Sequence, residues 1–132
     1  MEKKYINIPL GEGKTLSVHK RDAAKDSVIM SMLPKPPGTL FEASAGRAQL
    51  AQRLQCMGYV VSISNYDIEE ELPLSQMKLD LNKQKEDVLH GAPFDGIICR
   101  EVIEHVESVP HVLRLFQKNL VDDSTLPWFR TY

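Results

Sequence analysis

The sequence has little of several features that mark whole classes of protein. Only two of its 132 residues are cysteines, Cys56 and Cys99, and both lie in apolar contexts. We therefore expect two buried, reduced thiols and no disulfide. No CxxC pair and no cluster of histidine and cysteine indicates a zinc site. No apolar run approaches the length of a membrane span, and residues 1–14 lack the apolar stretch of a signal peptide. These absences predict a cytoplasmic protein without a membrane partner.

Charge of one sign is not in excess either. The chain has 16 basic and 18 acidic residues, which gives a formal net charge of −2. A protein whose main partner is nucleic acid usually carries a basic face, so we do not expect nucleic acid as the main partner. A chain of this length is enough for one domain with one core.

The N-terminal third differs in pattern from the rest of the chain. The first dozen residues are polar and predict a loose segment, and residues 17–33 carry apolar side chains at helical spacing. The proline-rich stretch 33–37 ends that helix. We therefore interpret residues 1–37 as an extension with a helix and residues 38–132 as the domain proper.

Strand and helix patterns alternate after residue 38. Strands are predicted at 39–43, 59–64, 77–81 and 94–99, and helices at 47–57, 83–89 and 109–120. Residues 67–72 read as a short helix or loop. Pro127 argues against a central strand in 125–132. This alternation predicts an α/β fold of the Rossmann-like kind, with a mostly parallel sheet and helices on both faces.

The first strand leads into an unusual turn within the sequence FEASAGRAQL, residues 41–50. Ser44, Gly46 and Ala48 stand where a G-x-G-x-G arrangement would have its glycines, and only Gly46 remains. Glycines in such a turn allow close approach of a ligand to the backbone and to a helix N-terminus. The residues alone leave two interpretations open: a nucleotide-binding turn, or a plain connection between strand and helix.

Polar residues also follow the next two predicted strands. Asn65 lies where nucleotide-binding folds place an acid for the ribose, and Asp67 lies two residues further on. Asp80 lies at the end of the third predicted strand and suits an adenine amino group. Helix capping explains Asn65, Asp67 and Asp80 equally well, so both interpretations stay open.

The last segment, FDGIICREVIEHVESVPHVLRLFQKNL, resembles the central block of class I S-adenosylmethionine-dependent methyltransferases. The similarity is greatest to the small-molecule branch that includes ubiquinone-biosynthesis O-methyltransferases. The turn at residues 42–46 and the strand that ends at Asn65 align with that family in order, so the resemblance covers residues 38–121. The positions that match its final block are Phe94, Asp95, Ile97, Cys99, Glu101, Glu104, His105, Val106 and Pro110.

The resemblance implies S-adenosylmethionine as cofactor and a small-molecule methyl acceptor as partner. It implies a catalytic base at His105 and a role for Glu101 on the substrate side, and no metal. It also implies that the family's C-terminal strands are missing, and a second copy or a partner chain then covers the open sheet edge. The implied cofactor-binding residues are Glu42, Ala43, Ser44, Gly46, Asn65, Tyr66, Asp80, Leu81, Cys99 and Arg100.

Three functions compete on these residues. The first is a methyltransferase domain, and the second is a non-catalytic, methyltransferase-like binding or scaffold module. The third is a dehydrogenase domain that binds NAD, in which the Glu104-His105-Val106 block has no role. The substituted turn favours the second function, whereas that block favours the first.

Overall fold

A parallel sheet forms the centre of the computed structural model, which describes residues 3–68, 70–83, 88–100, 105–121 and 129–130. Its strand order is β5-β4-β3-β6-β7, and every neighbouring pair is parallel. The strands are β3 (Gly38–Ala43), β4 (Tyr59–Asn65), β5 (Ser75–Lys78), β6 (Gly96–Cys99) and β7 (Phe129–Arg130).

The strand order reverses between β3 and β6. The chain adds β4 and β5 on one side of β3, and it then returns to place β6 and β7 on the other. Open sheets of this kind bind ligands beyond the carboxyl ends of the strands at the reversal. Ala43 pairs with Cys99 at this end, so residues 44 and 100 leave the sheet side by side.

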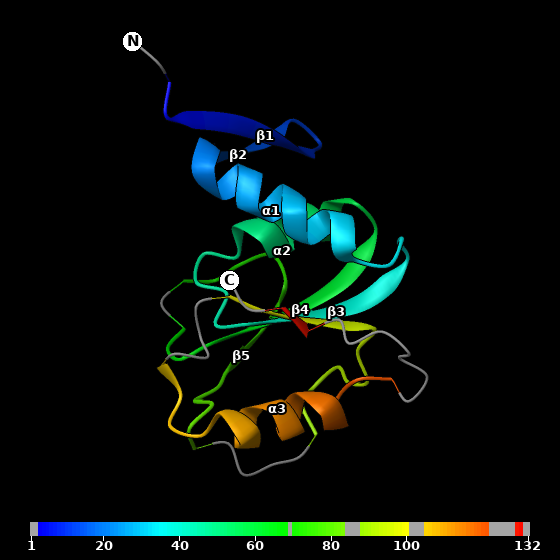
Figure 1. Ribbon diagram of the computed structural model, residues 1–132. Helices are drawn as coiled ribbons and strands as arrows, with labels where there is room; N and C mark the ends of the chain where they lie inside the picture. The colour runs from blue at the N-terminus through cyan, green and yellow to red at the C-terminus, as the bar shows by residue number, and fades with distance from the viewer. Residues whose placement is uncertain (1–2, 69, 84–87, 101–104, 122–128, 131–132) are drawn as a thin grey trace.

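Helices lie on both faces of the sheet, as the sequence predicts (Figure 1). The helices α1 (Lys20–Met32) and α2 (Gln49–Cys56) cover one face, and α3 (Val109–Lys118) covers the other. Strand side chains alternate between the two faces. Leu40 therefore belongs to the core cluster with Ile29 of α1 and Leu50 of α2, whereas Phe41 belongs to the cluster with Phe116 of α3. The predicted fold class is confirmed.

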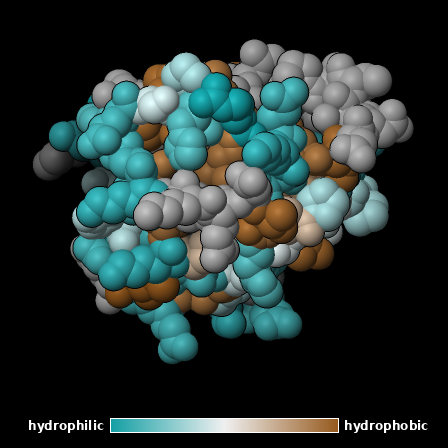
Figure 2. All heavy atoms as spheres, turned by 90° about the horizontal axis from the view of Figure 1, so that it is seen from below, coloured by the Kyte–Doolittle hydropathy of each residue, from teal (hydrophilic) through white to brown (hydrophobic). Residues whose placement is uncertain are grey.

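The helix α3 begins as its sequence predicts, with Ser108 as N-cap and Pro110 in the first turn. Its buried side chains are Val112, Leu115 and Phe116, and Leu113 is exposed. The face that α3 packs against the sheet therefore runs through Val112, Leu115 and Phe116. Figure 2, which views the molecule from the α3 side, shows hydrophobic side chains interspersed among hydrophilic ones on this face.

The polar N-terminal residues form an antiparallel hairpin, and the predicted loose segment is wrong. The hairpin consists of β1 (Tyr5–Gly11) and β2 (Lys14–His19). Gly11, Glu12 and Gly13 all have positive φ and make the tight turn between the strands. The Nδ1 atom of His19 then accepts a hydrogen bond from the Arg21 amide, so this histidine caps α1.

The helix α1 packs directly against the sheet. Ile29 shares a core cluster with Leu40 of β3, and Asp26 contacts Arg100 after β6. The division at residue 37 stays a prediction. Among the described residues, no helix is both long enough and apolar enough to cross a membrane.

Candidate functional site

The turn between β3 and α2 has the backbone of a glycine-rich turn. Ser44, Gly46 and Ala48 have φ values of 51°, 60° and 58°, which are all left-handed. Side chains disfavour this region by roughly 1–2 kcal/mol for each residue. Two residues therefore adopt strained angles at the positions where a G-x-G-x-G turn has glycine. The chain keeps the shape of such a turn although two of its glycines are replaced.

The end of β4 holds this turn in place. The Ser44 amide donates to the Ser64 hydroxyl at 3.1 Å, and the Ala45 amide donates to the Ser64 carbonyl at 2.9 Å. The Gly46 amide donates to Oδ1 of Asn65 at 2.7 Å, and Nδ2 of Asn65 donates to the Gly46 carbonyl at 3.0 Å. Polar side chains at the end of β4 thus fix the backbone of the neighbouring turn.

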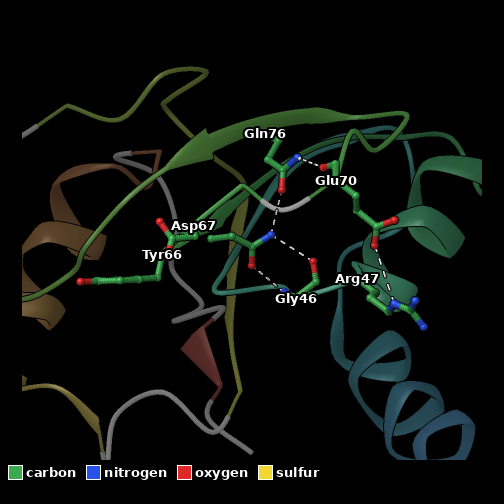
Figure 3. Close-up of a pocket in the computed structure, with 7 residues that line it drawn as sticks. Gly46, Arg47, Tyr66, Asp67, Glu70 and Gln76 are labelled. Atoms are coloured by element: carbon green, nitrogen blue, oxygen red, sulfur yellow. Dashed lines mark hydrogen bonds and ion pairs between the residues drawn. The ribbon is translucent and has the colours of Figure 1, made fainter.

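Two pockets flank the turn. The larger has a volume of about 510 Å³ and lies toward β4 and β5 (Figure 3). The smaller has a volume of about 220 Å³ and lies toward α1 and the reversal point. Ala45 lines the smaller pocket, and the next residue, Gly46, lines the larger one. The larger is lined by Gly46, Arg47, Asn65, Tyr66, Asp67, Glu70 and Gln76, and the smaller by Asp22, Lys25, Glu42, Ser44, Ala45, Gln49 and Arg100.

A cluster of charged residues lies behind the smaller pocket. Nη2 of Arg100 contacts Oε2 of Glu42 at 3.2 Å, and Nη1 of Arg100 contacts Oδ1 of Asp26 at 2.5 Å. Nη1 of Arg53 lies 3.7 Å from the other carboxylate oxygen of Asp26. Both acids are almost fully buried, at 1% exposure for Asp26 and 2% for Glu42. Burial of unpaired charge is costly, so Arg100 stabilises both carboxylates at once.

The carboxyl group of Glu42 has an unusual proton affinity. Desolvation by burial raises the pKa of Glu42 from 4.5 to about 7, and Arg100 only partly opposes this rise. Burial also raises the pKa of Asp26, again against the effect of Arg100. Oε1 of Glu42 is buried and accepts no hydrogen bond from the described residues. The smaller pocket therefore presents a buried acceptor that a cationic group of a ligand can satisfy.

Six of the ten predicted cofactor-binding residues line one of the two pockets. Glu42, Ser44 and Arg100 line the smaller pocket, and Gly46, Asn65 and Tyr66 line the larger one. The others line neither pocket. Ala43, Leu81 and Cys99 are buried in the core cluster on the α3 side, and Asp80 accepts a hydrogen bond from the Asn82 amide at 3.0 Å. Roles for these four residues stay predictions.

The structure describes one of the two predicted catalytic residues. His105 is exposed between β6 and α3 and lines neither pocket. Glu101 lies outside the described residues. Neither cysteine forms a disulfide, but the expectation of two buried thiols is wrong, because Cys56 is exposed and only Cys99 is buried.

The sequence analysis missed several residues that the structure brings to the site, among them Asp26 and Gln76. Asp26 lies between Ala23 and Ile29 on the buried face of α1, so an acid at apolar helical spacing was the available signal. Gln76 lies beside Asn65 because β5 begins at Ser75, two residues before the predicted strand. No local signal in the sequence marks Gln76.

Comparison with known proteins identifies the family of this chain. A family model described as a methyltransferase domain matches residues 17–126. A comparison with curated proteins finds no match for this sequence.

Several solved structures share the fold. Coclaurine N-methyltransferase, bound to N-methylheliamine and S-adenosylhomocysteine, has a TM-score of 0.66 at 13% identity, over 86% of this chain and 36% of that one. An S-adenosylmethionine-dependent methyltransferase from Agrobacterium tumefaciens has a TM-score of 0.62 at 12% identity, over 92% and 50%. Another from Mesorhizobium loti has a TM-score of 0.60 at 16% identity, over 71% and 47%. The chain thus spans half or less of the length of these three structures.

Proposed function

Because this chain belongs to the methyltransferase-domain family, we propose that it binds S-adenosylmethionine and forms part of an enzyme that methylates a small-molecule acceptor. The family match supports the resemblance stated from the sequence and favours it over an NAD-dependent dehydrogenase. The observation that carries the proposal is the left-handed turn at residues 44–48, which lies between two pockets at the carboxyl ends of β3 and β4.

The residues around the smaller pocket fit the amino-acid end of the cofactor. Its ammonium group would satisfy the buried Oε1 atom of Glu42, which accepts no hydrogen bond within the described part of the chain. Its carboxylate would face the cationic side chains of Lys25 and Arg100, which line the same pocket. The charges at this end are therefore complementary to a zwitterion.

The larger pocket fits the nucleoside end. The carboxylate of Asp67 lines it and can accept hydrogen bonds from ribose hydroxyls. Tyr66 lines the same pocket and is 62% exposed, so its ring is free to contact a base. S-adenosylmethionine supplies a methyl group activated by a sulfonium, and the task of the chain is to hold that group in line with the acceptor.

His105 remains our proposal for a base that accepts a proton from a hydroxyl acceptor. It lies between β6 and α3, the segment that follows Arg100 at the reversal point. Glu101 belongs to the same segment. We also propose that a second copy or a partner chain covers the open sheet edge at β7, beyond which the family's C-terminal strands would lie.

The alternative is a non-catalytic module that binds the cofactor without methyl transfer. The position of His105, outside the lining of both pockets, favours this alternative. The two functions share cofactor binding and differ in turnover.

Thermal unfolding with S-adenosylhomocysteine tests the shared part of both functions. Ligand at a hundred times its dissociation constant adds about 2.7 kcal/mol to the free energy of unfolding. We expect this ligand to raise the melting temperature and NAD to leave it unchanged. An unchanged melting temperature at millimolar S-adenosylhomocysteine contradicts cofactor binding. Transfer of a labelled methyl group to hydroxyl or amine acceptors then separates the enzyme from the binding module.

A further inference from the structure

The side-chain amide of Asn65 uses nearly all its hydrogen-bonding capacity inside the protein. Oδ1 accepts the Gly46 amide at 2.7 Å. Nδ2 donates to the Gly46 carbonyl at 3.0 Å and to Oε1 of Gln76 at 2.9 Å. An asparagine amide has two N–H donors, so both are occupied. Only one lone pair of Oδ1 is left for a ligand.

These bonds belong to a closed circuit around the larger pocket (Figure 3). Nε2 of Gln76 donates to the Glu70 carbonyl at 3.1 Å, and Oε1 of Glu70 lies 3.7 Å from Nε of Arg47. Arg47 follows Gly46 in the turn, so the circuit returns to its start. The Arg47–Glu70 pair is exposed and contributes little stability. The contacts of the Asn65 amide, at 2.7–3.0 Å, are the shortest in the circuit.

We propose that Asn65 is a positioning residue, which holds the turn in its left-handed shape and leaves the ribose to the carboxylate of Asp67. This inference rests on the proposed cofactor site. The turn needs such support because Ser44 and Ala48 have left-handed backbones that side chains disfavour. Asp67 lines the same pocket and is exposed, and its only ion pair in the described chain joins it to the exposed Lys78 at 3.5 Å.

The variant Asn65→Asp distinguishes the two possible roles of Asn65, contact with the ribose and support of the turn, because they predict opposite changes in affinity. If Asn65 binds the ribose, an aspartate improves the contact and tightens the binding of S-adenosylhomocysteine. If Asn65 supports the turn, an aspartate keeps the oxygen that accepts the Gly46 amide but puts its second oxygen in the place of Nδ2, where it faces the Gly46 carbonyl and Oε1 of Gln76. We expect binding to weaken by about tenfold, which corresponds to two neutral hydrogen bonds. Unchanged or tighter binding overturns the proposal.

Two further measurements separate support of the turn from contact with the ligand. Ser44→Gly removes the strain at an exposed turn residue, so it should restore most of the affinity lost in Asn65→Asp. The 2′-deoxy analogue of S-adenosylhomocysteine should lose the same factor in affinity with wild type and with Asn65→Asp, but a smaller factor with Asp67→Asn. Failure of Ser44→Gly to restore binding, or loss of the 2′-hydroxyl effect in Asn65→Asp, overturns the proposal.

One readout needs no ligand. The Gly46 amide donates to Asn65, so Asn65→Ala should accelerate hydrogen exchange of the Gly46 amide at least tenfold. The Ile63 amide in β4 is the reference, and any change in its exchange rate is subtracted. If wild type fails to bind S-adenosylhomocysteine, the proposed function fails, and the Gly46 exchange rate still decides the role of Asn65. An unchanged rate shows that Asn65 does not hold the turn.

Discussion

The guanidinium of Arg100 lies 3.2 Å from a carboxylate oxygen of Glu42, across the point where the sheet reverses its strand order. Glu42 ends the apolar run of β3, and Arg100 is the first residue after β6. The pair thus joins the two halves of the sheet at the place where a ligand is expected. Because Arg100 also contacts Asp26, one cation serves two buried acids.

Arg100→Ala should destabilise the protein strongly at pH 8. It leaves Asp26 and Glu42 buried with Arg53 as the one remaining cation that contacts either acid in the described structure. Removal of one partner from a buried ion pair typically costs about 3–5 kcal/mol. Urea unfolding measures this loss. The control is Arg114→Ala on the exposed side of α3, which should change stability by less than about 0.5 kcal/mol. Equal effects of the two variants contradict the importance of the cluster.

The raised pKa of Glu42 predicts a loss of stability as the pH rises. Its pKa is about 7 in the folded state against 4.5 ordinarily, so the protonated form favours folding. This contribution is fully present below pH 4.5 and is lost as the pH approaches 7. Between pH 5 and 8 the free energy of unfolding should fall about 3 kcal/mol further in wild type than in Glu42→Gln. Parallel curves for the two proteins show that Glu42 is ionised throughout.

Cofactor binding should release protons near neutral pH. An ammonium group beside Glu42 favours its carboxylate form and lowers its pKa, so part of the Glu42 population loses a proton on binding. Calorimetric titration with S-adenosylhomocysteine at pH 6.5, in two buffers of different ionisation enthalpy, measures that release. Glu42→Gln should show none. Identical proton release by both proteins shows that the ammonium group of the ligand does not bind beside Glu42.

Gly46→Val should abolish the binding of S-adenosylhomocysteine. A Cβ atom at Gly46 meets nothing within 4 Å, so it projects into open space beside the larger pocket. Gly13→Val is the matched control, because Gly13 also has positive φ and open surroundings but lies in the hairpin turn. Both variants should lose similar stability from backbone strain, and only Gly46→Val should lose the ligand-induced rise in melting temperature. Retained binding in Gly46→Val shows that the turn is only structural.

The two cysteines should differ in reactivity. Cys56 is exposed and Cys99 is fully buried. A thiol reagent should therefore modify one thiol quickly in the native protein and the second only after unfolding. Cys56→Ser should remove the fast phase. Two fast thiols in the native protein contradict the burial of Cys99.

The sequence predicts those features that depend on local pattern. Apolar periodicity gave the strands β3, β4 and β6 and the helices α2 and α3, because each of these elements buries one side or both. The N-terminal hairpin was missed because its strands are mostly exposed and the segment was judged by its polar composition, although Ile6, Ile8 and Leu10 alternate with other residues along β1. The ends of β5 were shifted for a similar reason, since this edge strand is only partly buried.

The site is harder to predict, because its contacts join distant segments. Asp26 and Arg100 are 74 positions apart, and nothing near either residue identifies the other as its partner. Nor does the sequence reveal the left-handed angles of Ser44 and Ala48, because these residue types rarely adopt them. The turn that contains them is held by hydrogen bonds from Ser44 to Ser64 and from Gly46 to Asn65, which only the folded sheet brings into place.

The contact between Asp26 and Arg100 also bears on how the protein opens. If α1 detaches from the sheet, Arg100 and Glu42 lose the acid that completes their cluster, and Asp26 loses both of its arginines. Opening of α1 alone is therefore costly, and we expect α1 and the carboxyl ends of β3 and β6 to unfold as one cooperative unit. A ligand that holds Glu42 and Arg100 should then slow hydrogen exchange throughout α1, including the turns that never touch it.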